Sequence, residues 1–337
     1  MNDTPKTSSN RRVLSGMQAS GRLHIGNFHG ALAKWVELQD DYQCFFFVAD
    51  WHALTTLYSE PGQVRRYSLE VATDFLAAGL DPQKSVVFLQ SDVPQHAELA
   101  LLLGMLTPVP WLERVPSYKD KQNQLTEKDL SSVGFLGYPV LQTADITLYR
   151  AGFVPVGEDQ LPHLELAREI VRRFNFIYGP TLVEPKEIVT PTPLLPGLDG
   201  RKMSKSYGNA VYLSDPDEEI RNKLRNAVTD PQRQRRKDPG RPEVCNIFAY
   251  HKLYTAEGRR QEIDAACRSA AIGCVDCKAE LIKNFFEFFG PLRERRRRLE
   301  AEPHLVKEVL AAGAERARAE AEQTMILVRE AMKLGIK

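Results

Sequence analysis

The chain has 337 residues, with 45 Lys and Arg against 44 Asp and Glu and a net charge of +1. This balance excludes a global electrostatic field that would attract RNA, so any RNA contact has to come from local basic patches. Residues 1–12 are polar and no apolar run reaches membrane-spanning length, so we expect a flexible N-terminus without a secretory signal, and a cytoplasmic protein with no membrane partner.

The N-terminal part of the chain alternates short apolar runs with segments of helical apolar spacing. Short continuous apolar runs are typical of buried parallel strands, whereas apolar residues every three or four positions indicate amphipathic helices. The expected strands are residues 12–15, 44–49 and 86–90, and the expected helices are 25–39, 64–78 and 96–106. This alternation predicts an α/β fold, a Rossmann-like doubly wound parallel sheet with its site at the carboxyl ends of the strands.

A phosphate site is predicted where the first strand gives way to the first helix. The segment His24-Ile25-Gly26-Asn27 stands at that helix start. The N-terminus of a helix presents free N–H groups to an anion, His24 can donate to a phosphate oxygen, and Gly26 lets a nucleotide approach the backbone closely. The same residues also fit a packed strand–turn–helix that simply has a histidine at the helix start.

A second phosphate-directed segment is Lys202-Met203-Ser204-Lys205-Ser206. The preceding residues are rich in proline and glycine, which places the two lysines on a loop. Mobile cationic loops suit phosphoryl and nucleotidyl transfer, where charge on a leaving group has to be neutralised. The alternative is a solvated basic loop.

The middle of the chain indicates the substrate. It contains Gly137-Tyr-Pro-Val-Leu-Gln-Thr-Ala-Asp145 and Val154-Pro-Val-Gly-Glu-Asp-Gln160, with His52 upstream. Together with the two signatures, in this order, these segments resemble the bacterial tryptophanyl-tRNA synthetases, which are class I aminoacyl-tRNA synthetases. Considered without the resemblance, Asp145 fits either a ligand-reading carboxylate or one bonded to a neighbour inside a helix.

The resemblance implies a tryptophan–tRNA ligase that activates L-tryptophan with ATP and Mg²⁺, transfers it to tRNA(Trp) and forms a homodimer. The implied catalytic residues are His24, Asn27, Lys202 and Lys205. The implied ATP-binding residues are Gln18, Ala19, Ser20, Gly26, Asn27, Lys121, Gly157, Glu158, Asp159, Leu194, Lys202, Met203, Ser204, Lys205 and Ser206. The implied tryptophan-binding residues are Gln18, His52, Gln142, Asp145, Val154, Val156 and Gln160.

Four of the five cysteines cluster late in the chain, at Cys245, Cys267, Cys274 and Cys277. In an intracellular protein, clustered cysteines with a Cys-x-x-Cys pair favour metal ligation over disulfides. Four thiolates suit a tetrahedral zinc or a 4Fe-4S cluster, and free thiols are the third possibility. A minority of tryptophanyl-tRNA synthetases carry a 4Fe-4S cluster at nearly this spacing, in the anticodon-binding domain. The fifth cysteine, Cys44, is expected in the core.

Past the second signature the strand-like runs fade and helical patterns dominate, ending in one long amphipathic helix over residues 303–333. We predict a flexible N-terminus, a Rossmann-like catalytic domain, a second-signature loop with an all-helical anticodon-binding domain, and a C-terminal helix. Their predicted limits are residues 1–12, 13–200, 201–300 and 301–337.

Two other functions remain open at this point. A tyrosyl-tRNA synthetase shares the fold and both signatures, although the segments around Asp145 and Gln160 match the tryptophan branch. A catalytically silent relative could sense tryptophan or bind RNA. Intact His24, Lys202 and Lys205 count against silence, because a binding module has no need of lysines that contact a leaving group.

Overall fold

The fold is known from a computed structural model, which describes residues 11–115, 131–189 and 195–335. Two predicted ATP-binding residues, Lys121 and Leu194, lie outside this description, as does the side chain of Ser206. In the described part of the chain, no helix is both long enough and apolar enough to span a membrane.

The centre of the fold is a five-stranded parallel sheet with the order β3-β2-β1-β4-β5. The strands are β1 (Arg12–Gln18), β2 (Gln43–Ala49), β3 (Ser85–Leu89), β4 (Phe153–Val156) and β5 (Lys186–Val189). The predicted α/β class is confirmed, and all three strands expected from apolar runs are present. Strands β4 and β5 were not predicted; β4 is only four residues long, and the side chains of β5 are mostly exposed and show no apolar run.

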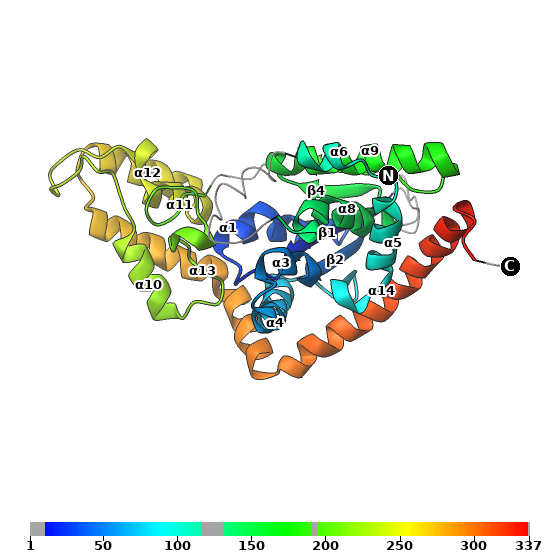
Figure 1. Cartoon of the computed structure of the whole chain (residues 1–337). Helices are drawn as coiled ribbons and strands as arrows, with labels where there is room; N and C mark the ends of the chain where they lie inside the picture. Colours follow the sequence, from blue (N-terminus) through cyan, green and yellow to red (C-terminus); the bar gives the residue numbers. More distant parts are fainter. Residues whose placement is uncertain (1–10, 116–130, 190–194, 336–337) are drawn as a thin grey trace, which may run out of the picture. The chain divides into compact units, whose positions relative to one another are not determined.

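Helices pack on both faces of the sheet (Figure 1). Neighbouring strand residues point to opposite faces, and the two phenylalanines of β2 show what each face meets. Phe46 stacks on Trp35 with ring centroids 4.8 Å apart, and Phe45 stacks on Tyr149, also at 4.8 Å. Because both faces are covered, β2 has to be apolar throughout, and Cys44 is fully buried as expected.

The helices around the sheet connect its strands or cover its faces. They are α2 (Ala33–Leu38), α3 (Asp50–Leu57), α4 (Pro61–Ala78), α5 (Gln95–Gly104), α6 (Val109–Glu113), α8 (Val133–Leu148), α9 (Leu161–Tyr178) and α14 (Pro303–Ala331). The helix predicted over 25–39 is divided. It comprises α1 (Ile25–Asn27), a π-helical turn (Phe28–Leu32) and α2.

The chain divides into two compact units. Unit 1 contains residues 1–21, 30–192 and 299–337, and unit 2 contains residues 22–29 and 193–298. The chain therefore passes between the units four times. The functional domain limits expected from the sequence stay a prediction. The compact units have different limits, because the last helix packs on the sheet of unit 1 and the first signature pairs with the segment after the second.

Unit 2 contains helices and short turns. The helices are α1, α10 (Asp217–Asn226), α11 (Asn246–Tyr254), α12 (Glu257–Arg268) and most of α13 (Cys274–Ala301), and the 3-10 turns are Lys205–Tyr207 and Pro242–Val244. Tyr254 of α11 and Phe289 of α13 pack at a centroid distance of 5.7 Å, which gives this unit an aromatic core of its own.

The C-terminal helix α14 packs on the edge of the sheet. Strand β3 is the first strand in the order, and a Cβ atom at Gly313 of α14 would lie 1.8 Å from the carbonyl oxygen of Val87. Only a glycine permits this approach. Nearby, Arg316 donates to the carbonyl oxygen of Ser85, at 3.3 Å. The helix thus covers the exposed side of β3.

Candidate active site

In unit 1, the predicted amino-acid site lies where the strand order reverses. Strands β2 and β3 lie to one side of β1, and β4 and β5 lie to the other, and such a switch point is the usual place for a ligand crevice. Gln18 is the last residue of β1, and Gly157 follows the last residue of β4. Val154 is buried and Val156 is half-buried on β4.

The other predicted residues of this unit flank the same strand ends. Ala19 is buried and its N–H donates to the carbonyl of Ala49, at 3.3 Å, while Ser20 is half-buried. Beyond Gly157, a 3-10 turn (Glu158–Gln160) exposes Glu158 and Asp159. In that turn the Gln160 amide donates to the Asp159 carboxylate, at 3.0 Å.

Asp145 on α8 is a buried carboxylate with three protein donors. Its exposed fraction is 1%, and its Oδ2 lies 2.7 Å from Nε2 of His52. Its Oδ1 receives the Gln90 amide at 2.8 Å and lies 2.7 Å from Nδ1 of His96. Burial alone would raise the pKa of Asp145, but the charges and hydrogen bonds of His52 and His96 lower it to about 2. Asp145 is therefore an ionised acceptor at neutral pH.

Three residues of this cluster were not predicted from the sequence: Gln90, His96 and Tyr149. All are fully buried, and the Tyr149 hydroxyl lies 2.8 Å from Nε2 of His96. Gln90 directly follows strand β3, a position that could have drawn attention because it is at a carboxyl end. Gln142, which was predicted, lies half-buried on α8, three residues before Asp145.

In unit 2, His24 caps helix α1 with its ring. The Asn27 N–H donates to Nδ1 of His24, at 3.2 Å, and the Asn27 side-chain oxygen accepts the His24 N–H, at 3.0 Å. This is a reciprocal capping box. Since Nδ1 accepts a hydrogen bond, the neutral ring carries its proton on Nε2. Burial and then the charge of Lys205 lower the pKa of His24 to about 4. His24 is thus a neutral donor at physiological pH.

The structure brings the two signatures together within unit 2. The Ile25 N–H donates to the Val211 carbonyl, at 3.0 Å, just beyond the second signature. Met203 is buried, and a Cβ atom at Gly26 would lie 3.7 Å from its sulfur. Ser204 and Lys205 are half-buried and Lys202 is exposed, so the lysines border solvent beside the helix start.

Asn209 organises the second signature and was not predicted. Its side chain accepts the Ser204 N–H at 2.9 Å and donates to the Lys202 carbonyl at 3.1 Å and to Asp199 at 2.7 Å. Asn209 is buried, and a Cβ atom at Gly197 would lie 2.2 Å from its amide nitrogen. The loop is thus wrapped around a single buried amide.

The four clustered cysteines also lie in unit 2 and influence one another. Burial and the charges of the other three raise the pKa of Cys277 to about 12. The pKa of Cys267 is also raised, through burial and the charges of Cys245 and Cys274, against the opposing charge of Arg233. Among the residues that the structure describes, no group of three or more His, Cys, Asp or Glu side chains is arranged to hold a single metal ion.

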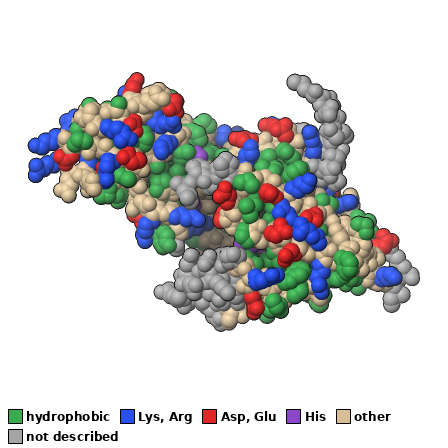
Figure 2. Space-filling view, turned by 90° about the horizontal axis from the view of Figure 1, so that it is seen from above, with side chains coloured by type: hydrophobic (Ala, Val, Ile, Leu, Met, Phe, Trp, Pro, Cys, Tyr) green, Lys and Arg blue, Asp and Glu red, His purple; other side chains and the backbone are tan. Residues whose placement is uncertain are grey.

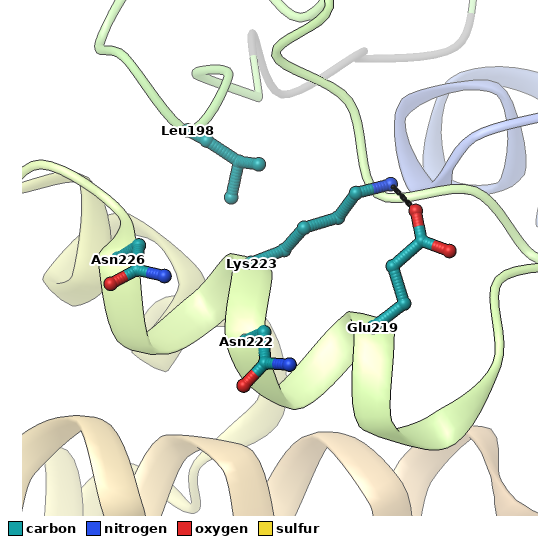
Figure 3. A pocket seen from close by; sticks show the side chains of 5 residues that line it. All are labelled: Leu198, Glu219, Asn222, Lys223 and Asn226. Carbon is teal, nitrogen blue, oxygen red and sulfur yellow. Dashed lines mark ion pairs between the residues drawn. The ribbon is translucent and has the colours of Figure 1, made fainter.

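A surface hollow lies on helix α10 (Figure 3). It is lined by Leu198 and by four residues with polar side chains, Glu219, Asn222, Lys223 and Asn226, and Lys223 bonds to Glu219 at 2.7 Å. Lys223 also pairs with the buried Asp215, which in turn binds Arg22 at 3.0 Å. These contacts tie the start of the first signature to α10.

Charged side chains of both signs are mixed over the face seen in Figure 2, in keeping with the balanced net charge. Several arginines that could contact RNA are engaged internally. Arg293 is buried and donates to the Asp215 carbonyl, at 2.8 Å, and Arg233 is buried and donates to the Ile272 carbonyl, at 2.7 Å. Arg235 and Lys237, in the segment of residues 233–237, are exposed.

The chain is similar to known proteins over nearly its whole length. Residues 6–290 match the family described as tRNA synthetases class I (W and Y). The chain is 50% identical to the tryptophan–tRNA ligase of Thermotoga maritima, over 96% of this chain and 99% of that protein. It is 44% identical to the ligase of Aquifex aeolicus, over 96% and 100% of the two chains.

A similar solved structure is the tryptophanyl-tRNA synthetase of Campylobacter jejuni in complex with ADP and tryptophan. The TM-score is 0.88 at 37% identity, over 96% of this chain and all of that one. Family match, relatives and fold agree with the geometry of the two signatures and the buried carboxylate. The chain belongs to the tryptophanyl-tRNA synthetases, the class I enzymes that ligate tryptophan to its tRNA.

Proposed function

We propose that this chain activates tryptophan with ATP, that the residues around Asp145 bind the amino acid, and that the two signatures bind the phosphates of ATP. The observation that carries the amino-acid site is the buried, ionised Asp145, which is bonded to His52 and Gln90 beyond the carboxyl ends of β2 and β3. A carboxylate offers about four acceptor positions, and the described residues fill three of them, which leaves one for a ligand that donates.

Asp145 is the acceptor for the indole N–H in this proposal. A ligand without that donor would leave one position of a buried carboxylate unpaired, and such sites discriminate strongly. Val154 and Val156 would line the ring. The polar residues His52, Gln142, Gln160 and Gln18 would hold the remainder of the amino acid. The structural counterpart from Campylobacter jejuni, crystallised with ADP and tryptophan, supports a site for both ligands.

In the first step, a carboxylate oxygen of tryptophan attacks the α-phosphorus of Mg²⁺-ATP, and the bond to the β-phosphate breaks to release pyrophosphate. His24, a neutral Nε2–H donor, would stabilise charge on the phosphates, and Lys202 and Lys205 would neutralise the leaving pyrophosphate. A hydroxyl of the tRNA 3′-terminal ribose then takes the aminoacyl group and AMP leaves. Positioning and electrostatics carry this reaction, with no protein acid or base.

The remaining ATP contacts are predictions from the family resemblance. Gly157, Glu158 and Asp159 would meet the ribose and adenine, and the exposed carboxylates of the 3-10 turn are accessible for this role. Ala19, Ser20, Gly26, Asn27, Met203 and Ser204 would line the nucleotide. Lys121, Leu194 and Ser206 complete the proposed set.

The test is exchange of pyrophosphate into ATP, measured with tryptophan and with tyrosine. We expect exchange that depends on tryptophan and is at least about 1,000-fold weaker with tyrosine. In the Asp145→Asn variant, discrimination between tryptophan and an isostere lacking the ring N–H should collapse. A folded protein that activates no amino acid would show a silent relative instead, and preference for tyrosine would place it in the other branch.

For the four cysteines we propose a 4Fe-4S cluster. Its four ligands bind four separate irons, so the thiols need not converge on one point as a zinc site requires. The surroundings fit an anionic thiolate group: the N–H groups of Ile247 and Phe248 face Cys245, and Arg233 donates to the sulfur of Cys267, at 3.5 Å. Among described residues, none accepts from Nε of the buried Arg233.

A close approach of backbone to sulfur supports the same assignment. A Cβ atom at Gly240 would lie 2.5 Å from the sulfur of Cys267, so this face is open only because the residue is glycine. When bound, the group would cross-link the ends of α11, α12 and α13. Iron and acid-labile sulfide per chain after anaerobic purification, with a visible spectrum, tests the proposal; zinc alone, or no metal, would overturn it.

We further propose a cytoplasmic homodimer that binds tRNA(Trp) through its helical domain. The exposed residues Arg235, Arg236 and Lys237 support a phosphate contact beside the cysteine group, since Arg236 also reaches Asp276, at 3.6 Å. Neutralising two of these charges should weaken tRNA binding and flatten its salt dependence, while leaving pyrophosphate exchange unchanged. Size-exclusion chromatography with light scattering tests the dimer.

A further inference from the structure

A chain of hydrogen bonds extends from Asp145 away from the proposed tryptophan site. Oδ1 of Asp145 lies 2.7 Å from Nδ1 of His96, and Nε2 of His96 lies 2.8 Å from the Tyr149 hydroxyl. His96 belongs to α5 and Tyr149 directly follows α8, so the chain joins two helices of unit 1. Both side chains have an exposed fraction of 0%.

The ionised carboxylate fixes the hydrogen-bond role of the His96 nitrogen beside it. The ionised Asp145 can only accept, so Nδ1 of His96 carries a proton and donates it to Oδ1. Burial, and then the charge of Asp145, raise the pKa of Tyr149 well above its ordinary value, so the phenol keeps its proton. The other ring nitrogen of His96, Nε2, is bonded to the Tyr149 hydroxyl at 2.8 Å. The hydroxyl thereby holds the ring in place behind the carboxylate.

These bonds leave only one part of the carboxylate open. Among the residues that the structure describes, Oδ1 has two partners, His96 and Gln90, whereas Oδ2 has only His52. A carboxylate offers about four lone-pair positions, two on each oxygen. The remaining position is therefore on Oδ2.

His96 is better anchored than Gln90, its partner on Oδ1. Both ring nitrogens of His96 are bonded, one to Asp145 and one to Tyr149. Among the described residues, by contrast, none donates to Oε1 of Gln90, so this amide is held at one end only. The orientation of the carboxylate thus depends chiefly on the imidazole and on the phenol behind it.

We propose that His96 and Tyr149 are positioning residues that set specificity for a ligand with a ring N–H. His96 occupies Oδ1 together with Gln90, so the open acceptor position of Asp145 is on Oδ2. Tyr149 holds the His96 ring, and the ring in turn keeps the carboxylate from rotating, so that a ligand has to donate to Oδ2. This inference rests on the proposed role of Asp145 as the indole acceptor, and adds to it the residues that aim the acceptor.

The test compares two deletions of a single hydroxyl. Tyr149→Phe removes the outer bond of the chain. The matched control is Tyr138→Phe, because Tyr138 of α8 is also buried and also bonds a buried histidine, with its hydroxyl 2.7 Å from Nε2 of His163. The assay is pyrophosphate exchange with tryptophan and with its benzothiophene isostere, in which sulfur replaces the ring N–H.

In Tyr149→Phe we expect the preference for tryptophan over the isostere, as a ratio of kcat/KM, to fall about five- to tenfold. The KM for tryptophan should rise with kcat almost unchanged, because a binding contact is loosened and the phosphate chemistry is not. Tyr138→Phe should keep the wild-type ratio. His96→Asn, which keeps a donor near the Nδ1 position, should retain more of the preference than His96→Leu.

The outcomes separate this inference from the role of Asp145. If Asp145→Asn abolishes the preference but Tyr149→Phe and His96→Leu keep it, the positioning role is overturned and the acceptor role stands. If Asp145→Asn itself keeps the wild-type preference, the acceptor assignment fails and the inference fails with it. Equal losses in Tyr149→Phe and Tyr138→Phe would also overturn it, by showing a general effect of core hydroxyl loss.

Discussion

Burial keeps two histidines of this enzyme uncharged at physiological pH. His24 and His29 both lie in unit 2, and burial lowers the pKa of each to about 4, with the charge of Lys205 contributing at His24. His29 packs among aromatic rings and its Nε2 lies 2.9 Å from the Tyr254 hydroxyl. Both rings are therefore neutral at physiological pH, and neither supplies a titration near neutrality.

The substitution His24→Asn separates the two tasks of this residue. The side-chain oxygen of an asparagine can accept the Asn27 N–H at the start of α1, as Nδ1 of His24 does in the wild type. No donor would remain at the position of Nε2–H. We expect kcat for pyrophosphate exchange to fall by about 100-fold, with little change in melting temperature. Steady-state kinetics and thermal unfolding check this. A variant that loses stability and activity together would show that His24 acts mainly as a cap.

Acid should weaken unit 2 through these neutral histidines. Each has a folded pKa of about 4 against 6.5 in an unfolded chain, so the unfolded state binds more protons between these values. The stability from each is present above pH 6.5 and is lost as pH falls toward 4. The variant His29→Gln can keep the bond to Tyr254. It should lose about 2 kcal/mol less of its free energy of unfolding than the wild type does between pH 7.5 and pH 5.

Denaturant unfolding of wild type and His29→Gln at the two pH values measures this difference. Subtracting the pH-dependent change in the variant from that in the wild type removes the contributions of the other groups that titrate between these pH values. An identical pH dependence in the two proteins would show that His29 titrates normally in the folded state.

At the scale of elements, the second signature depends on a loop that α11 and a buried amide hold in place. Tyr250 of α11 donates to the Pro196 carbonyl, at 2.6 Å, and Asn246 donates to the Gly197 carbonyl, at 3.3 Å. Asn209 closes the loop from inside. The lysines are thus carried on a short loop whose ends are fixed.

Removing the amide should release this loop. In Asn209→Ala we expect kcat to fall about tenfold or more, and residues 197–209 to exchange amide hydrogen faster, because several hydrogen bonds are lost at once. The control is Asn226→Ala, on the exposed surface of α10. Hydrogen exchange and pyrophosphate exchange together check this. Unchanged protection in Asn209→Ala would contradict the anchoring role.

The sequence predicted those elements and residues whose signals are local. Strand β2 is apolar throughout because both its faces are covered, and helix α14 has a clear apolar spacing, so both were found. His96 and Tyr149 could not be found, since His96 meets Asp145 only through a contact 49 residues away in the chain. Asn209 was missed because its partners depend on how the loop folds back. The π-helical turn after α1 likewise leaves no mark in the apolar pattern.

At the scale of the whole molecule, the last helix belongs to the first sheet. Residues 299–337 form part of unit 1, although residues 193–298 belong to unit 2. Periodicity predicts that residues 303–333 form a helix, but it does not say which surface the helix covers. The pairing of α14 with β3 depends on Gly313, whose missing side chain leaves room for the Val87 carbonyl.

Gly313→Ala should therefore destabilise the protein by about 2 kcal/mol or more, because the new methyl group meets backbone and the helix has to move. Glycine-to-alanine changes inside helices normally stabilise by about 0.5–1 kcal/mol. Gly137→Ala in α8, where a Cβ atom meets nothing within 4 Å, should show this ordinary gain. Denaturant unfolding of both variants checks the contrast; a stabilised Gly313→Ala would contradict the close packing.

The late arrival of α14 has a consequence for biosynthesis. Strand β3 ends at Leu89 and the helix that covers its edge ends at Ala331, so roughly 240 residues have to be translated in between. At about 5–20 residues per second, a ribosome needs roughly 10–50 s for this. Throughout that interval the nascent sheet presents an uncovered edge strand, which is a template for pairing with other chains. Incomplete chains on the ribosome are therefore the form of this enzyme that most needs a chaperone.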